Sequence, residues 1–128
     1  MSRKKSLILT DHELRLMEVL WQRGRGTVAD VVEAVAPPPL AYSTVLTTLR
    51  TLEQKGYIAH EEEGRAYVYR PLVERGDAAK SAMQHVLGRF FGNSPGALAV
   101  TLLDGAPLSE DDRAKLERIL AKRRGGAK

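Results

Sequence analysis

The sequence predicts a mainly α-helical chain that contains one small β-hairpin. Three observations predict this fold class. Apolar residues recur at helical spacing in three separate segments before residue 56. A segment rich in tyrosine and valine, broken by a glycine turn, follows at residues 57–70 and is typical of a hairpin. Helical spacing then returns after Pro71 and continues almost to the end of the chain.

The first helix is expected to begin after Thr10. The run Thr-Asp-His-Glu is a capping box, in which the Thr10 hydroxyl accepts from the amide of Glu13 and the Glu13 carboxylate reaches back. Gly24 and Gly26 are expected to end this helix. Its apolar residues lie on one broad face: Leu14, Leu16, Met17, Leu20 and Trp21.

Two further helices are expected before the hairpin. Thr27 can cap a short helix that runs to Ala36, where the triplet at 37–39 stops it because proline has no amide donor. The next helix is expected from Ala41 to Lys55, and Gly56 supplies the left-handed residue that ends it.

The order helix, helix, helix, hairpin is that of a winged helix-turn-helix. Beyond Pro71, further helices are expected at about 77–91, 95–103 and after Ser109. We therefore expect a winged helix-turn-helix followed by a helical dimerisation domain, with the domains at 1–71 and 72–128.

Composition excludes several classes of function. The 128 residues are 43% hydrophobic, and the longest apolar run, at 97–103, is too short to span a bilayer. No signal peptide is expected, so we predict a cytoplasmic protein that does not insert into membranes. The absence of cysteine excludes disulfides and thiolate metal sites. His12, His60 and His85 are scattered and no catalytic motif is present, so no metal, cofactor or enzymatic activity is expected.

The third predicted helix carries five hydroxyl residues, although threonine is a mediocre helix former. On a helical wheel, Val45, Leu49 and Leu52 form the buried stripe and the hydroxyls lie opposite. Solvated faces usually carry Glu and Lys, whereas hydroxyls donate to phosphates and contact base edges. This pattern favours double-stranded DNA over a neutral surface, and the net charge of +4 permits it. The expected contacts are Ser43, Thr44, Thr47, Arg50, Thr51 and Gln54.

The apolar stripes after Pro71 are too large for so short a segment to bury alone. A twofold partner would cover them, so we expect a homodimer. Phe90 and Phe91 are expected at this interface or against the winged helix. The full set of expected dimer residues is Val86, Leu87, Phe90, Phe91, Leu98, Leu102, Leu116, Ile119 and Leu120.

Four runs together resemble a known family: LTDHELRLMEVLW from residue 9, AYSTVLTTLRTLEQKGYI from 41, GRAYVYRP from 64 and LSEDD from 108. The sequence resembles the penicillinase-repressor (BlaI/MecI) family of bacterial transcriptional regulators. The resemblance implies a homodimeric repressor that binds inverted-repeat operators upstream of antibiotic-resistance genes. It also adds Tyr42 and, in the wing, Arg65 to the expected DNA contacts.

Two features depart from the family pattern. In several members a membrane sensor protease cuts an Asn-Phe bond in the dimerisation helices when a β-lactam arrives. This chain has no Asn-Phe, which argues against cutting at that bond, and Thr101-Leu102 lies near the matching position. The wing also carries acidic residues 61–63, which should repel phosphate, so Arg65 is the one wing contact expected.

Two alternatives stay open. The acidic wing favours a winged-helix module that docks on another protein rather than on DNA. The second alternative is a regulator that binds DNA in the same way but is released by a small molecule, which would bind in a C-terminal cavity.

Overall fold

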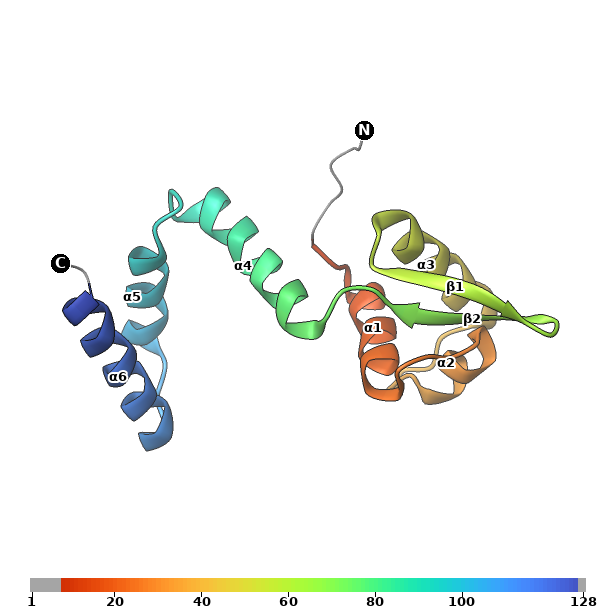
Figure 1. The fold of residues 1–128 in the computed structure, drawn as a ribbon, viewed down its shortest axis with the longest axis horizontal. Helices are drawn as coiled ribbons and strands as arrows, with labels where there is room; N and C mark the ends of the chain where they lie inside the picture. Colours follow the sequence, from red (N-terminus) through yellow and green to blue (C-terminus); the bar gives the residue numbers. More distant parts are fainter. Residues whose placement is uncertain (1–7, 127–128) are drawn as a thin grey trace. The chain divides into compact units, whose positions relative to one another are not determined.

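The sequence-based expectation of a mainly helical fold with a β-hairpin is confirmed (Figure 1). The structure is a computed structural model, and it describes residues 8–126. In chain order the elements are α1 (Asp11–Arg23), α2 (Val28–Ala34), α3 (Tyr42–Lys55), β1 (Ile58–Glu63), β2 (Ala66–Pro71), α4 (Arg75–Phe90), α5 (Pro95–Gly105) and α6 (Glu110–Gly126). The chain divides into two compact units between Val86 and Leu87, within α4.

Side chains cap the first two helices. The predicted box at α1 is present: the Thr10 hydroxyl accepts from the Glu13 amide at 3.1 Å, and a Glu13 carboxylate oxygen accepts from the Thr10 amide at 2.9 Å. Thr27 and Asp30 form a second box at α2, with both distances 3.0 Å. α3 ends at Gly56, whose φ of 90° places it in the left-handed region that glycine tolerates.

The hairpin is a regular antiparallel pair in which Ile58 opposes Pro71 and His60 opposes Tyr69. The backbone of Gly26 adds a bridge to the free edge of β2, with reciprocal N–H to O distances of 2.9 and 2.8 Å to Tyr69. The loop between α1 and α2 therefore fixes β2 to the helices, and the hairpin turn extends beyond them in Figure 1.

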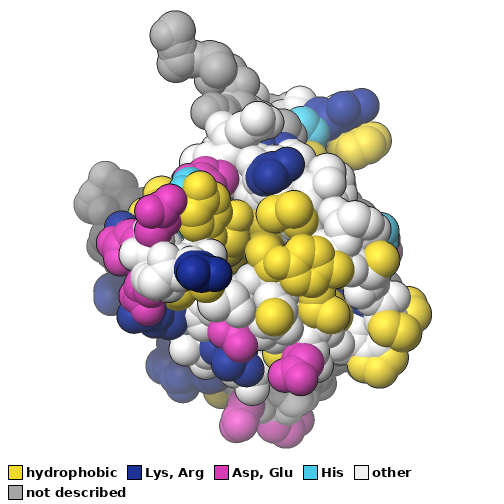
Figure 2. Space-filling view, turned by 90° about the vertical axis from the view of Figure 1, so that its right-hand side faces the viewer, with side chains coloured by type: hydrophobic (Ala, Val, Ile, Leu, Met, Phe, Trp, Pro, Cys, Tyr) yellow, Lys and Arg dark blue, Asp and Glu magenta, His cyan; other side chains and the backbone are white. Residues whose placement is uncertain are grey.

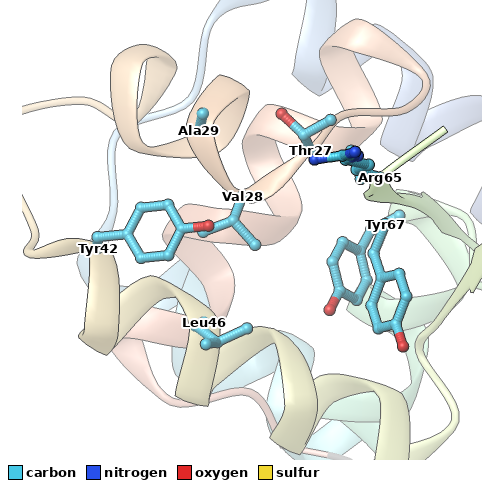
Figure 3. A pocket seen from close by; sticks show the side chains of 9 residues that line it. Thr27, Val28, Ala29, Tyr42, Leu46, Arg65 and Tyr67 are labelled. Carbon is cyan, nitrogen blue, oxygen red and sulfur yellow. The ribbon is translucent and has the colours of Figure 1, made fainter. Parts of the chain in front are cut away.

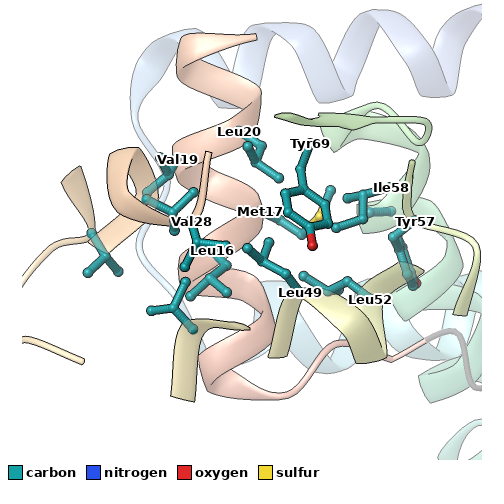
Figure 4. Close-up of a cluster of buried hydrophobic side chains, with 14 residues drawn as sticks. Leu16, Met17, Val19, Leu20, Val28, Leu49, Leu52, Tyr57, Ile58 and Tyr69 are labelled. Atoms are coloured by element: carbon teal, nitrogen blue, oxygen red, sulfur yellow. The ribbon is translucent and has the colours of Figure 1, made fainter. Parts of the chain in front are cut away.

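One core holds α1, α2, α3 and the hairpin together (Figure 4). The predicted stripe of α3 is completely buried. Only 2% of the surface of Tyr69 and 1% of that of Ile58 is exposed. The buried residues are Leu16, Met17, Val19, Leu20, Val28, Val31, Val35, Val45, Leu49, Leu52, Tyr57, Ile58, Tyr69 and Ala78.

Leu14 lies on the predicted apolar face of α1 but outside this core, since 41% of its surface is exposed. It lines an apolar groove of about 280 Å³ together with Ile8, Trp21 and the first turns of α4. Trp21 is half-buried there, and its Nε1 donates to the Val73 carbonyl oxygen at 2.8 Å. The other elements do not cover the whole apolar face of α1, so the residues at its edge line this groove.

In the second unit, α5 has no buried residue. Large apolar side chains are exposed on both of its later helices: Val100, Leu102 and Leu103 on α5, and Ile119 and Leu120 on α6. No helix within residues 8–126 is both long and apolar enough to cross a membrane.

Candidate nucleic-acid interface

α3 presents the hydroxyl-rich face outward. Tyr42, Ser43, Thr47, Arg50 and Gln54 are exposed, and Thr44 and Thr51 are half-buried. The predicted contacts on α3 therefore share one accessible side of the helix, opposite its buried stripe.

Not every hydroxyl on this face is a free donor. The Thr51 hydroxyl donates to the Thr47 carbonyl oxygen one turn earlier, at 3.1 Å. Such bonds within a helix are usual for threonine and leave the hydroxyl able to accept only. Thr51 is thus suited to a donor on a base or to contact through its methyl group.

The first half of α3 is also low in relief. Ser43, Thr44, Thr47 and Thr48 line a shallow hollow of about 270 Å³ on the helix surface. Short side chains let a partner approach close to the helix axis, as a helix in the major groove requires. Thr48 was not among the predicted contacts; it is half-buried, next to the buried stripe on the helical wheel.

A larger hollow of about 380 Å³ lies between α2, α3 and the wing (Figure 3). Tyr42 stands on one side of it, and Arg65 and Tyr67 on the other. The structure thus brings together Tyr42 and Arg65, which are 23 residues apart in the sequence. We name this hollow the strand pocket; its lining residues are Thr27, Val28, Ala29, Tyr42, Leu46, Arg65, Ala66, Tyr67 and Tyr69.

Sequence reasoning missed Tyr67, which is 45% exposed on the pocket wall. Alternation along β2 was the available signal, because Tyr67 and Tyr69 point to the same face of the hairpin. The ring of His60 stacks on Tyr67, with centroids 4.3 Å apart and an interplanar angle of 23°. His60 is in turn held by α3, since its Nδ1 lies 2.8 Å from both carboxylate oxygens of Glu53.

The three wing glutamates do not act alike. Glu61 pairs with Arg70 at 3.8 Å, and Glu63 pairs with Arg25. Register places these two on one face of the hairpin, whereas Glu62 opposes Tyr67 on the other. Among the described residues Glu62 has no ion pair, so the expected repulsion of phosphate is concentrated on this one carboxylate.

Figure 2 shows the face that bears the hairpin turn. Hydrophobic side chains gather at its centre, with basic and acidic side chains around them. Within the pocket wall, burial raises the pKa of Tyr69 above its usual 10, the charge of Glu53 raises this pKa further, and Arg50 opposes both.

The expected dimer residues differ in exposure. Phe90, Leu102, Ile119 and Leu120 are exposed, Val86, Phe91, Leu98 and Leu116 are half-buried, and Leu87 is buried within the single chain. Thr101, next to Leu102 in α5, is exposed. Among residues 8–126, His, Asp and Glu side chains nowhere form a group of three suited to a metal ion.

Comparison with known proteins decides the family. The model of a family described as "Penicillinase repressor" matches residues 9–122. The chain belongs to the penicillinase repressor family. The resemblance read from the four sequence runs is confirmed. So is the expectation that the chain is not an enzyme, because the family is one of transcriptional repressors.

Curated relatives match most of the chain at low identity. The penicillinase repressor of Bacillus licheniformis is 27% identical over 118 residues, covering 91% of this chain and 92% of the relative. The methicillin resistance regulatory protein MecI of Staphylococcus aureus strain N315 is 20% identical over 120 residues, covering 93% and 98%. The transcriptional regulator BlaI of Mycobacterium tuberculosis is 35% identical over 83 residues, covering 63% and 60%.

Solved structures share the fold. The solution structure of the DNA-binding domain of the repressor BlaI matches with a TM-score of 0.51 and 29% identity, covering 58% of this chain and 93% of that domain. The YusO protein of Bacillus subtilis matches over 92% of this chain and 76% of its own, with a TM-score of 0.50 and 20% identity. The winged helix-turn-helix followed by helices is therefore confirmed as the fold class.

Proposed function

We propose that the chain is a homodimeric transcriptional repressor that binds an inverted-repeat operator in double-stranded DNA. We assign DNA binding to residues 1–71 and dimerisation to residues 72–128. The protein would act in the cytoplasm.

The single observation that carries this proposal is the outward face of α3. This face carries Arg50 and small hydroxyl side chains, four of which line a shallow hollow, and its first turn has no acidic residue. Hydroxyls and guanidinium groups bind phosphates and read base edges, so this surface suits a major groove. If this face only had to be solvated, Glu and Lys would suit it better than threonine, because they are better helix formers.

The acidic wing no longer favours a protein-docking module. Arg70 and Arg25 partner two of its three glutamates, and both pairs lie on the hairpin face away from Tyr67. The face that carries Tyr67 stands next to α3 and includes Arg65 in the same hollow. Glu62 is the one wing glutamate that remains on this face. The pairing of the other two, with Arg65 next to α3, supports DNA as the partner.

Dimerisation is supported by the exposed apolar side chains of the second unit. Leu102 is 58% exposed, and Ile119 and Leu120 are 54% and 61% exposed. Burial of such side chains against a second copy is favourable at about 25 cal/mol per Å² of apolar surface. A twofold dimer would place the two α3 helices one helical turn apart, about 34 Å, to match an inverted repeat.

The regulated genes are proposed from the relatives. One relative is named a penicillinase repressor and another a methicillin resistance regulatory protein. We propose that this chain controls antibiotic-resistance genes, β-lactam resistance included, or related genes. Release by a membrane sensor protease would need a cut in α5, where Thr101 and Leu102 are exposed. The missing Asn-Phe bond argues against that route.

Selection from a random duplex library, followed by titration of the winners at two salt concentrations, tests the proposal. We expect an inverted repeat with half-sites about 10 base pairs apart and an affinity that falls steeply with salt. Arg50→Ala should weaken binding about tenfold or more, and Thr47→Ala should reduce discrimination between operator and other DNA. Arg113→Ala, which removes an exposed arginine of α6, is the matched control. No enrichment, or unchanged affinity in Arg50→Ala, would contradict the proposed function.

The dimer is tested separately by sedimentation. The wild-type chain should sediment as a dimer, and Ile119→Glu should shift it toward the monomer because a carboxylate would be desolvated in the interface. A wild-type chain that is monomeric at micromolar concentration would contradict the dimer. An Ile119→Glu dimer of unchanged strength would show that Ile119 of α6 does not lie in the interface.

A further inference from the structure

The strand pocket is larger than the shallow hollow on α3 and differs from it in chemistry. Its mouth is aromatic and basic: Tyr42 is 57% exposed, Tyr67 is 45% exposed, and Arg65 is exposed beside them. Its floor is apolar, formed by Val28 and Leu46 (Figure 3). An occupant should therefore combine a negative charge with an apolar body.

A nucleotide unit of a DNA strand has this combination. The phosphate can accept from the tyrosine hydroxyls and pair with the guanidinium of Arg65, and bonds to a charged group are the stronger ones. The carbon atoms of the deoxyribose can pack against the tyrosine rings and the apolar floor. At α3, Ala41 supplies no side-chain cap, so first-turn amides of the helix have no side-chain partner at Ala41 and can donate to a backbone phosphate.

The position of the pocket agrees with this occupant. It separates α3, the proposed major-groove element, from the hairpin that carries Arg65. A strand that leaves the major groove at α3 and passes beside the hairpin must cross this hollow. Contacts to the backbone set the register of a protein on its operator, even though they read no base.

The wall of the pocket is held in place by the end of α3. Tyr67 lies diagonally across the hairpin from His60, within reach of a ring contact, and their rings stack at 4.3 Å. Glu53, in α3, holds His60, whose Nδ1 lies 2.8 Å from both of its carboxylate oxygens. Tyr69, which opposes His60 in the hairpin, also contacts it, with ring centroids 5.6 Å apart. The side chain of Tyr67 is thereby positioned by two residues that do not line the pocket.

We propose that the strand pocket binds the deoxyribose and phosphate of one operator nucleotide, and that Tyr67 is a DNA-contacting residue which His60 positions. This inference rests on the proposed function and names the backbone site that accompanies base reading by α3. It adds Tyr67 and His60 to the residues that decide operator affinity.

A methylphosphonate scan of the selected operator tests this inference. Each duplex carries one uncharged methylphosphonate, and its affinity is measured for wild type and Tyr67→Phe. On unmodified operator, Tyr67→Phe should lose about tenfold, because a hydrogen bond to a charged group is lost. At the one backbone position that Tyr67 contacts, the loss of affinity from the methylphosphonate and the loss from Tyr67→Phe should not add. At every other position the two losses should add. The other positions are internal controls.

Arg65→Ala provides a second reading that does not depend on one hydroxyl. It should lower the slope of log affinity against log salt by about one phosphate contact. Its loss should fail to add at the same backbone position as that of Tyr67→Phe. Non-additivity at two distant positions would separate Arg65 from the pocket and overturn a shared site.

The role of His60 is read from the same coupling. His60→Ala should reduce the non-additivity between Tyr67 and its backbone position. His60→Phe, which keeps a ring against Tyr67 but loses the contact with Glu53, should retain part of it. Trp21 fluorescence under urea, compared across the variants, separates this effect from a loss of folding. Equal coupling in wild type and His60→Ala would show that His60 positions nothing.

The inference and the proposed function fail differently. If Arg50→Ala loses affinity while Tyr67→Phe binds as wild type at every duplex, the strand pocket is not a backbone site and the repressor proposal stands. If no operator is enriched at all, the proposed function fails and this inference falls with it.

Discussion

The ion pair between Glu13 and Lys55 ties the start of α1 to the end of α3, and replacing Glu13 by alanine measures its strength. The Glu13 side chain is 6% exposed and lies 2.8 Å from the Lys55 ammonium nitrogen. The same carboxylate oxygen also accepts from the Thr10 amide at 2.9 Å. One group therefore completes the cap of α1 and holds the helix that we propose reads DNA.

Glu13→Ala removes both contributions. Loss of half of the capping box costs about 1 kcal/mol. Lys55, 20% exposed, is left without its partner. Breaking a fully buried pair costs about 3–5 kcal/mol, and partial exposure reduces this to about 2 kcal/mol. We expect the free energy of unfolding to fall by about 3 kcal/mol, a large share of the total for a small domain.

Urea unfolding followed by Trp21 fluorescence provides the assay, because the one tryptophan lies in the first unit and reports on it alone. Thr10→Ala is the matched control, since it removes only the cap hydroxyl and should cost about 1 kcal/mol. Lys55→Met added to Glu13→Ala should recover part of the loss by removing the unpaired charge. A Glu13→Ala protein as stable as Thr10→Ala, or a double variant no better than Glu13→Ala, would refute this reasoning.

Three further predictions concern the wing, the second capping box and the end of α3. Glu62→Gln should tighten operator binding about twofold, because a carboxylate roughly 10 Å from a phosphate costs about 0.4 kcal/mol in water; Glu117→Gln on α6 is the control. The Thr27 backbone amide, then its hydroxyl, hold the pKa of Asp30 below its usual 3.8. A lowered pKa contributes stability above pH 3.8 that is lost as the pH falls further, so the urea midpoint of Asp30→Asn should fall less steeply between pH 5 and pH 3. Gly56→Ala should cost about 1 kcal/mol in urea unfolding, because alanine is strained at a φ of 90°.

Local signals in the sequence were sufficient for the helices and for most of their ends. The end of α2 is an exception: the helix was expected to run to Ala36, and it ends at Ala34 with Val35 already extended. The capping box at Thr10 and the left-handed Gly56 act between neighbours along the chain, and both are present as predicted. The buried stripe of α3 follows from the helical period alone, so Val45, Leu49 and Leu52 were placed correctly.

Contacts between distant segments could not be predicted in this way. Arg25 and Glu63 are 38 residues apart, and Glu13 and Lys55 are 42 apart. Which glutamate of the wing is left unpaired depends on the register of the hairpin and on the loop after α1, neither of which is visible in residue spacing. Alternation along β2 could place Tyr67 on the same face as Tyr69, but its exposure on the pocket wall depends on how the hairpin packs beside α3.

The stability of α3 comes from residues other than those on its proposed binding face. Threonine is a weaker helix former than alanine, and Ala41 gives the helix no side-chain cap. The compensating contacts lie on the buried stripe and in the last turn, where Glu53 holds His60 and Lys55 holds Glu13. Because these contacts avoid the hydroxyl face, substitutions on that face should change DNA selection with little effect on folding. A repressor of this architecture can therefore change its operator through residues that its core does not use.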